Sequence, residues 1–393
     1  MNFPNHFAFG TSTSAAQIEY ATDHDWSGFK ARDGTIFKHT TDHESRLEQD
    51  LDIIGSLAPN YRMSVLWSRL QPSPMVDFDG AAVEFYHRLF EGLQDRGVTP
   101  MLVLHHFANP SWFAVRGGWA SGEALDLWLD FIDKLLAKFG HYAGSFNTFN
   151  EPNIYVTMAH LLGQFPPRGR NPVRALRVLK NMAQAHHEAV ALIRSKCPGK
   201  PVGLSINTAL LEGENLLGRL PAALSDWWYH EYIPSHFEGV DFFGMSYYAR
   251  IGYDPLPVTV LHTPEKIAKK GVMHDDMWEY EPSGLGMNIR RFWDRYRLPV
   301  IVTENGVCSS DDALRVTAIE DYLAQILGCI QDGIDVRGYY HWSPWDNFEW
   351  NLGSSFRFGL YETDPITMDR RKRPSADRYA EIVRTGTISP GGK

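Results

Sequence analysis

The segment SFNTFNEP, residues 145–152, is an apolar and aromatic run that ends at an acid, Glu151, and is followed directly by a proline. Short apolar runs bounded by turn signals predict buried strands. Proline cannot donate a hydrogen bond to a strand ladder, so Pro152 marks the point where the strand stops. The segment therefore predicts a strand over 145–150 with a carboxylate at its carboxyl end.

Similar apolar or β-branched runs recur along the chain and predict seven further strands, at 7–13, 61–67, 99–106, 201–207, 241–248, 299–304 and 336–342. Amphipathic helical patterns lie between these runs, most clearly at 43–58, 123–140, 174–196 and 316–333. Near-continuous apolar strands are typical of a parallel sheet covered on both faces. Eight alternations of strand and helix without a Pro/Gly/Ser-rich linker predict the α/β class, as a single (β/α)8 TIM barrel spanning 1–393.

An open, doubly wound α/β sheet is the competing architecture. Such a sheet commonly carries a glycine-rich phosphate-binding turn after its first strand. The corresponding stretch here, GTSTSAAQ at 10–17, has no such glycine pattern. The closed barrel is therefore the favoured fold.

Composition narrows the classes of partner and compartment. The formal net charge is −9 and there is no basic stripe, so we expect neither nucleic acid nor an anionic membrane as partner. The N-terminus MNFPNHFAFG lacks the pattern of a secretory signal, and no apolar run reaches 18 residues. Cys197, Cys308 and Cys329 are widely spaced, which predicts reduced thiols, no metal site and a cytoplasmic protein.

A second carboxylate occupies a position equivalent to that of Glu151. In VTENG, 302–306, Glu304 ends the seventh apolar run as Glu151 follows the fourth. In a parallel barrel both side chains would emerge at the same mouth, where catalytic groups of this architecture lie. Two facing carboxyl groups, one protonated and one ionised, are the minimal apparatus for cleaving a glycosidic bond. An isolated glutamate of this kind would more often pair with a surface Lys or Arg.

Several segments in the same order resemble those of glycoside hydrolase family 1, the retaining β-glucosidases and their relatives. They are TFNEP at 148–152, VTENG at 302–306, FAFGTSTSAAQIEYA at 7–21, YRMSVLWSRLQP at 61–72, LHHFANPSWFAVRGGW at 104–119 and HWSPWDNFEW at 341–350. The resemblance runs almost from end to end. It implies a TIM barrel that needs no metal or organic cofactor.

The resemblance also implies a role for each matching residue. Glu304 would be the nucleophile and Glu151 the general acid/base, with Arg62 holding Glu304 ionised as catalytic support. The implied substrate-binding residues are Gln17, His106, Asn150, Tyr248, Trp342, Glu349 and Trp350. Without the motif, the neighbouring His105 is an equal candidate to face the pocket.

The function implied is a retaining exo-β-glycosidase that releases terminal non-reducing β-D-glycosyl residues through a covalent glycosyl-enzyme. Small β-glycosides or oligosaccharides would be its substrates, and the acid at Glu349 disfavours a 6-phosphorylated sugar. A β-glucosidase with β-galactosidase or β-fucosidase activity remains open, as do the oligomeric state and the balance with transglycosylation. An endo-acting glycanase and an inactive carbohydrate-binding barrel are the rival functions.

The sequence departs from the family pattern at several places. Ser246 stands where the family commonly has Asn, Phe107 where Trp is usual, and Tyr20 where Gly is expected. The region 20–42 is also shorter than usual. Loops of this kind shape the leaving-group side of the pocket, so the natural leaving group stays open.

Overall fold

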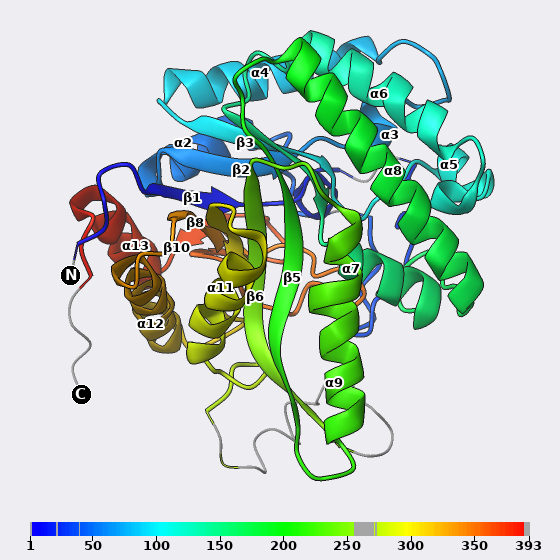
Figure 1. The fold of residues 1–393 in the computed structure, drawn as a ribbon. Coiled ribbons are helices and arrows are strands. Elements are labelled where there is room, and N and C mark those ends of the chain that lie inside the picture. The colour runs from blue at the N-terminus through cyan, green and yellow to red at the C-terminus, as the bar shows by residue number, and fades with distance from the viewer. Residues whose placement is uncertain (1, 21–22, 39, 255–270, 272, 389–393) are drawn as a thin grey trace.

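A computed structural model of the chain describes residues 2–20, 23–38, 40–254, 271 and 273–388. Within them, eight parallel strands close into a barrel in sequence order, with β1 paired to both β2 and β8 (Figure 1). The barrel strands are β1 Ala8–Ser12, β2 Asn60–Ser64, β3 Thr99–His105, β4 Ser145–Asn150, β5 Val202–Gly213, β6 Phe242–Tyr253, β7 Val300–Asn305 and β8 Val336–Trp342. The predicted (β/α)8 barrel is therefore confirmed.

Helices surround the barrel and connect successive strands (Figure 1). The longer α-helices are α2 Leu47–Leu57, α4 Gly80–Asp95, α6 Ala124–Phe139, α8 Pro172–Lys196, α9 Arg219–Trp227, α11 Ser283–Tyr296, α12 Asp312–Gln331 and α13 Pro374–Thr385. The shorter helical segments are α1 Ala15–Ile18, α3 Trp67–Leu70, α5 Ser111–Val115, η1 Gly118–Ala120, α7 Pro152–Val156, η2 Thr157–Leu161, η3 Trp228–Tyr232 and η4 Pro234–His236. A small hairpin, β9 Tyr361–Thr363 with β10 Arg370–Lys372, precedes α13.

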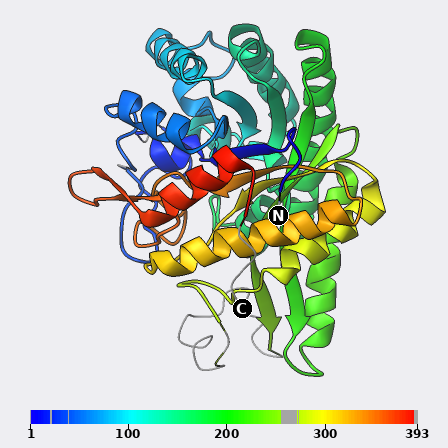
Figure 2. The same cartoon turned by 90° about the vertical axis from the view of Figure 1, so that its left-hand side faces the viewer.

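The two ends of the described chain meet beside the barrel. The amide of Phe3 donates to the carbonyl of Gly386 over 2.8 Å. Figure 2 shows α13 (red) packed beside α12 (orange), where Arg378 of α13 donates to Glu320 of α12. Closure of the barrel between β1 and β8 therefore brings the chain ends together.

Local sequence signals explain where the helices begin and which face they bury. The side chains of Asp79, Asn171 and Asp311 accept hydrogen bonds from backbone amides in the first turns of α4, α8 and α12. In α2 the apolar stripe predicted from the sequence, including Leu47 and Leu51, is buried against the barrel. The amphipathic pattern thus determines which side of each helix faces the strands.

Two strands extend by several residues beyond their predicted limits. The sequence predicts strands over 201–207 and 241–248, whereas β5 reaches Gly213 and β6 reaches Tyr253. The extension is maintained by pairing between the two strands, as at Leu211 and Ile251, beyond the apolar run that marks the barrel core. Figure 1 shows both strands projecting from the barrel as a two-stranded arm.

In the described part of the chain, no helix combines the length and apolar character needed to cross a membrane.

We predict that Gly10→Ala lowers the free energy of unfolding by about 1–3 kcal/mol, because overpacking forces neighbours to move. A Cβ at Gly10 would lie 2.4 Å from the Tyr340 ring and 2.9 Å from the Asn60 carbonyl oxygen, at the closure of the barrel. Gly122→Ala is the matched control, since a Cβ there meets nothing within 4 Å. Urea unfolding followed by circular dichroism measures both. Equal midpoints for the two variants would contradict this account of barrel closure.

Candidate active site

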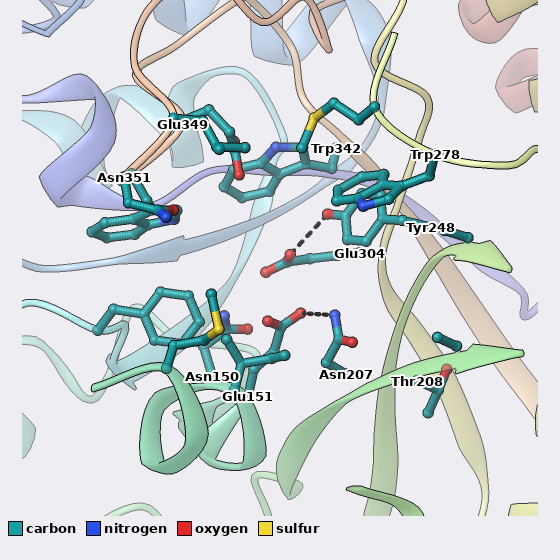
Figure 3. Close-up of a pocket in the computed structure, with 18 of the residues that line it drawn as sticks. Asn150, Glu151, Asn207, Thr208, Tyr248, Trp278, Glu304, Trp342, Glu349 and Asn351 are labelled. Carbon is teal, nitrogen blue, oxygen red and sulfur yellow. Dashed lines mark hydrogen bonds between the residues drawn. The ribbon is translucent and has the colours of Figure 1, made fainter. Parts of the chain in front are cut away.

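A pocket opens at the carboxyl ends of the barrel strands, with an empty volume of about 970 Å³ that includes open solvent (Figure 3). Eight of the site residues singled out in the sequence line it: His106, Asn150, Glu151, Tyr248, Glu304, Trp342, Glu349 and Trp350. The other two, Gln17 and Arg62, are fully buried and contact these lining residues from behind. Residues from five strands, from α1 and from the segments that follow β3, β4 and β8 therefore converge on one cavity.

Glu304, near the end of β7, is held by two donors. Arg62 Nη1 lies 2.5 Å from Glu304 Oε1, and the Tyr248 hydroxyl donates to Oε2 over 2.9 Å (Figure 3). Arg62 lies in the middle of β2. Both oxygens of the Glu304 carboxylate are thus bonded, one of them to a full positive charge.

The guanidinium of Arg62 is itself positioned by a buried polar network. It donates to Asn150 Oδ1 over 2.5 Å, to Ser12 Oγ over 3.1 Å and to Ser205 Oγ over 3.2 Å. These partners come from β4, β1 and β5, so strands on opposite sides of the barrel fix one cation. A buried cation held by several partners cannot move to a different carboxylate without leaving polar groups unpaired.

Glu151 lies in a different environment from Glu304. Its carboxylate accepts a hydrogen bond from the Asn207 amide over 3.1 Å (Figure 3). Burial raises the pKa of Glu151 to about 8, and the nearby negative charge of Glu304 raises it further. The hydrogen bond from Asn207 lowers this pKa, but its effect is weaker. At neutral pH this carboxyl group is therefore largely protonated.

The pKa of Glu304 is also raised by burial, but the charge of Arg62 opposes that rise, and the hydrogen bond from Tyr248 acts in the same direction as Arg62. The Arg62 guanidinium contacts Glu304 directly, whereas the partner of Glu151 is the neutral side-chain amide of Asn207. Glu304 therefore ionises more readily than Glu151. The pocket thus holds one readily ionised and one largely protonated carboxyl group.

Glu349 is a third carboxyl group in the same pocket, and it is half-buried. Burial raises its pKa to about 8, together with the charges of Glu304 and Glu151, while a hydrogen bond with Gln17 opposes the shift. Gln17 donates to Asn347 Oδ1 over 3.1 Å and to the Phe348 carbonyl over 2.9 Å, and its own Oε1 has no protein partner. This end of the pocket therefore contains polar groups that a ligand could satisfy.

The two adjacent histidines have different surroundings. His106 lines the pocket, and its Nε2 accepts from the Asn150 amide over 2.9 Å while its Nδ1 has no partner. His105 instead bonds Asn109 and packs against Trp119 inside the core. Burial lowers the pKa of His106 well below its usual value, with the Arg62 charge adding to the shift, so the ring is neutral.

Three pocket residues have left-handed backbone conformations. The φ angles of Phe107, Glu151 and Trp350 are 62°, 44° and 43°. Such values are unfavourable for residues with a Cβ and cluster at functional sites. Glu151 follows the last residue of β4, and Pro152 is the first residue of α7. The proline therefore both stops the strand and begins a helix.

Sequence reasoning missed Asn207 and much of the apolar lining of the pocket. Asn207 is the last residue of the predicted strand 201–207, and Glu151 and Glu304 likewise lie at the ends of predicted strands. A polar residue at the end of a predicted strand was therefore a usable signal. The apolar lining residues, such as Met158 and Trp278, come from loops and short helices without a periodic pattern. In the described residues, no group of three His, Cys, Asp or Glu side chains is arranged to hold a metal ion.

Comparison with known proteins places the chain in a family. The model of glycosyl hydrolase family 1 matches residues 1–215 and 235–387. A β-glucosidase of Agrobacterium sp. is 29% identical, over 97% of this chain and 95% of that protein. The structure of a β-glycosidase from Pyrococcus horikoshii is 32% identical with a TM-score of 0.86, over 99% of this chain and 96% of that one.

A β-glucosidase from Thermotoga maritima has been solved in complex with deoxynojirimycin and with galacto-hydroximolactam. Those structures are 25% identical to this chain, with TM-scores of 0.87 and 0.86, and each aligns with 99% of this chain and 100% of its own. The family model and these relatives thus align with nearly the whole sequence. The chain therefore belongs to glycosyl hydrolase family 1 and is a retaining glycosidase of the β-glucosidase type.

Proposed function

We propose that this protein is an exo-acting retaining β-glycosidase in which Glu304 is the nucleophile and Glu151 the general acid/base. The observation that carries the proposal is the unequal environment of two carboxyl groups in one pocket. Glu304 contacts the buried Arg62 cation, whereas Glu151 has a pKa of about 8. Glycoside hydrolysis with retention needs this division, at a separation of roughly 5 Å.

In the first step, the Glu304 carboxylate attacks the anomeric carbon and the bond to the leaving oxygen breaks. Glu151 gives its proton to that oxygen, so the leaving group departs as a neutral alcohol. The Tyr248 hydroxyl and Arg62 hold the attacking carboxylate in place. The product is a covalent glycosyl ester on Glu304 and an ionised Glu151.

In the second step, Glu151 acts as a base. Ester formation removes the negative charge of Glu304, which is the second largest cause of the raised pKa of Glu151. The pKa of Glu151 therefore falls, and the ionised carboxylate accepts a proton from water as that water attacks the anomeric carbon. Hydrolysis releases the sugar with its original configuration and restores both carboxyl groups.

Exo action is supported by the polar end of the pocket. Gln17 is buried there and Glu349 is half-buried, and Trp342 and Trp350 provide aromatic surfaces on the lining. The free polar atoms of Gln17 and His106 would bond the hydroxyls of one terminal sugar. Asn150, already oriented by Arg62, would contact the 2-hydroxyl. An endo-acting enzyme would instead need an open cleft on both sides of the scissile bond.

Glucose and galactose are both suitable sugars for this site. The Thermotoga maritima enzyme is described in complexes with deoxynojirimycin and with a galacto-configured lactam. Glu349, with Gln17 behind it, could accept a 4-hydroxyl in either orientation, because a carboxyl group has two oxygens. We accordingly propose β-glucosidase activity accompanied by activity on β-galactosides and β-fucosides.

Removing the nucleophile tests the central assignment. We predict that Glu304→Ala lowers kcat on 4-nitrophenyl β-D-glucoside at least about a thousandfold, since the covalent route is lost. Added azide should restore part of the activity and give an α-glycosyl azide, because a single displacement inverts the anomeric carbon. Release of 4-nitrophenol and NMR of the product measure these effects.

Glu151→Ala should give the opposite product. With Glu304 intact, azide replaces water in the second step, and two displacements give a β-glycosyl azide. Glu188→Ala, at an exposed glutamate on α8, is the control and should behave as the native chain. Formation of the same azide anomer by both active-site variants would refute the division of roles.

The pH profile follows from the raised pKa of Glu151. Because the first step needs Glu151 protonated, kcat/KM should fall as pH rises through about 8. Glu304→Gln removes the neighbouring charge, so the pKa of Glu151 in that variant should be lower than in the native protein. Kinetics of the native enzyme and 13C NMR titration of labelled glutamate in the variant measure these values. An unchanged or higher pKa in the variant contradicts the coupling.

The pocket is also unsuited to a phosphorylated sugar. Among the described residues that line it there is no Lys or Arg, and Arg62 behind it is bonded to Glu304 and Asn150. A phosphate dianion would therefore be desolvated without a cation to compensate. We predict that kcat/KM for 4-nitrophenyl β-D-glucoside exceeds that for its 6-phosphate at least about a hundredfold. Comparable values would overturn this specificity.

A further inference from the structure

The apolar part of the pocket lining differs from the polar end that contains Glu349. We call it the outer pocket and define it by six residues: Ile154, Met158, Ala209, Ile251, Met277 and Trp278. They come from α7, η2, the β5–β6 arm and the loop after β6. Ile154 and Met158 follow Glu151 on α7 and η2. Ala209 follows Asn207, which bonds Glu151, so this part of the lining lies on the side where Glu151 would protonate the leaving oxygen.

One wall of the outer pocket is the α7–η2 segment, which starts immediately after Glu151. Ile154 and Met158 lie one turn apart on it and both face the pocket. A second wall is the β5–β6 arm, which continues past Asn207 and Tyr248. The first wall therefore follows Glu151 directly in the chain. The second wall follows Asn207 and Tyr248, which contact Glu151 and Glu304.

A β-bulge determines which residues of the arm face the pocket. The register passes from Thr208↔Tyr247 to Leu210↔Arg250, so two residues of β6 oppose Ala209 alone. Beyond the bulge, Ile251 faces the pocket and Arg250 points to the other side, where it pairs with glutamates of the arm and of the following loop. The charges of the arm are thus directed away from the leaving-group position.

The polar groups on this side are mostly occupied. The Asn207 amide donates to Glu151, and the Thr208 hydroxyl donates to the Ser246 carbonyl over 2.9 Å. Among the described residues on this side, the groups left for a ligand are the indole N–H of Trp278 and the hydroxyl of Tyr229, since the Asn351 amide donates to Gln164 over 3.4 Å. A second sugar would bring several hydroxyls into this space, and most of them would lose water without gaining a partner.

We propose that the preferred substrates are β-glycosides of apolar alcohols, aryl or alkyl, and not disaccharides. This inference rests on the proposed function, because it assigns the leaving group of that reaction. The apolar part of the leaving group lies between the α7–η2 wall and the β5–β6 arm, in contact with Met158 and Ile251. Burial of that part, and not hydrogen bonding, provides the selectivity.

A series of alkyl β-D-glucosides tests the proposal without changing the chemistry. Butyl, hexyl and octyl alcohols are leaving groups of nearly equal acidity, so differences in kcat/KM report contacts with the alkyl chain. We expect kcat/KM to rise about twofold to fourfold per added methylene, as burial of each CH2 predicts. The kcat/KM for octyl β-D-glucoside should also exceed that for cellobiose, although glucose is a more acidic leaving group than octanol.

Two variants locate the effect in the outer pocket. Met158→Gln keeps the length of the side chain and Ile251→Thr keeps its β-branching, and each should lower the octyl-to-butyl ratio of kcat/KM at least about fivefold. The matched control is Met287→Gln on α11, where the methionine is 53% exposed. That substitution should leave the ratio at its native value.

The possible outcomes separate this inference from the function on which it rests. A chain-length series without slope, or a preference for cellobiose over octyl β-D-glucoside, would overturn the apolar leaving group while the glycosidase assignment stands. A native ratio in both Met158→Gln and Ile251→Thr would also overturn it. If the native protein cleaves no β-glycoside, including the 4-nitrophenyl compound, the proposed function itself fails.

Discussion

The contact between Arg62 and Glu304 is the interaction on which the rest of the site depends. Two buried carboxyl groups and one half-buried carboxyl group share one pocket, and in a medium of low dielectric their mutual repulsion is large. The guanidinium offsets the charge of Glu304, which it touches, and leaves Glu151 and Glu349 with pKa values of about 8. The placement of one cation therefore distinguishes otherwise similar acids.

Barrel closure makes that placement possible. Arg62 and Glu304 are separated by 242 residues, and the other partners of Arg62 come from β1, β4 and β5. Only a closed ring of strands brings these side chains to a common centre. Burying such a network is costly unless each member is bonded, and the rigid strands keep the bonds in place. The fold thus stabilises an arrangement of charges that a flexible loop could not maintain.

The two parts of the pocket separate the groups suited to the sugar from those suited to the leaving group. The end near Glu349 contains free polar atoms of Gln17 and His106, suited to the hydroxyls of a sugar. The outer pocket is formed by α7, η2 and the β5–β6 arm, which lie beyond the barrel core and present apolar side chains. Loops at this face of a TIM barrel can change without disturbing the strands. The same reacting centre can consequently act on chemically different leaving groups.

The sequence by itself determined the fold class, most strand positions and the two glutamates, because strand periodicity and strand-end signals are local. The strands at 145–150 and 336–342 match their predictions residue for residue. The resemblance to glycoside hydrolase family 1 added Gln17, Arg62 and the other pocket residues, whose individual identities carry no local pattern.

Only the tertiary structure decided that Asn207 contacts Glu151 and that β5 and β6 extend into an arm. It also decided the unequal pKa values, because these depend on burial and on charges brought close through space. The physical reason is the same in each case: the contacts join residues distant in the chain, and closure of the barrel sets them.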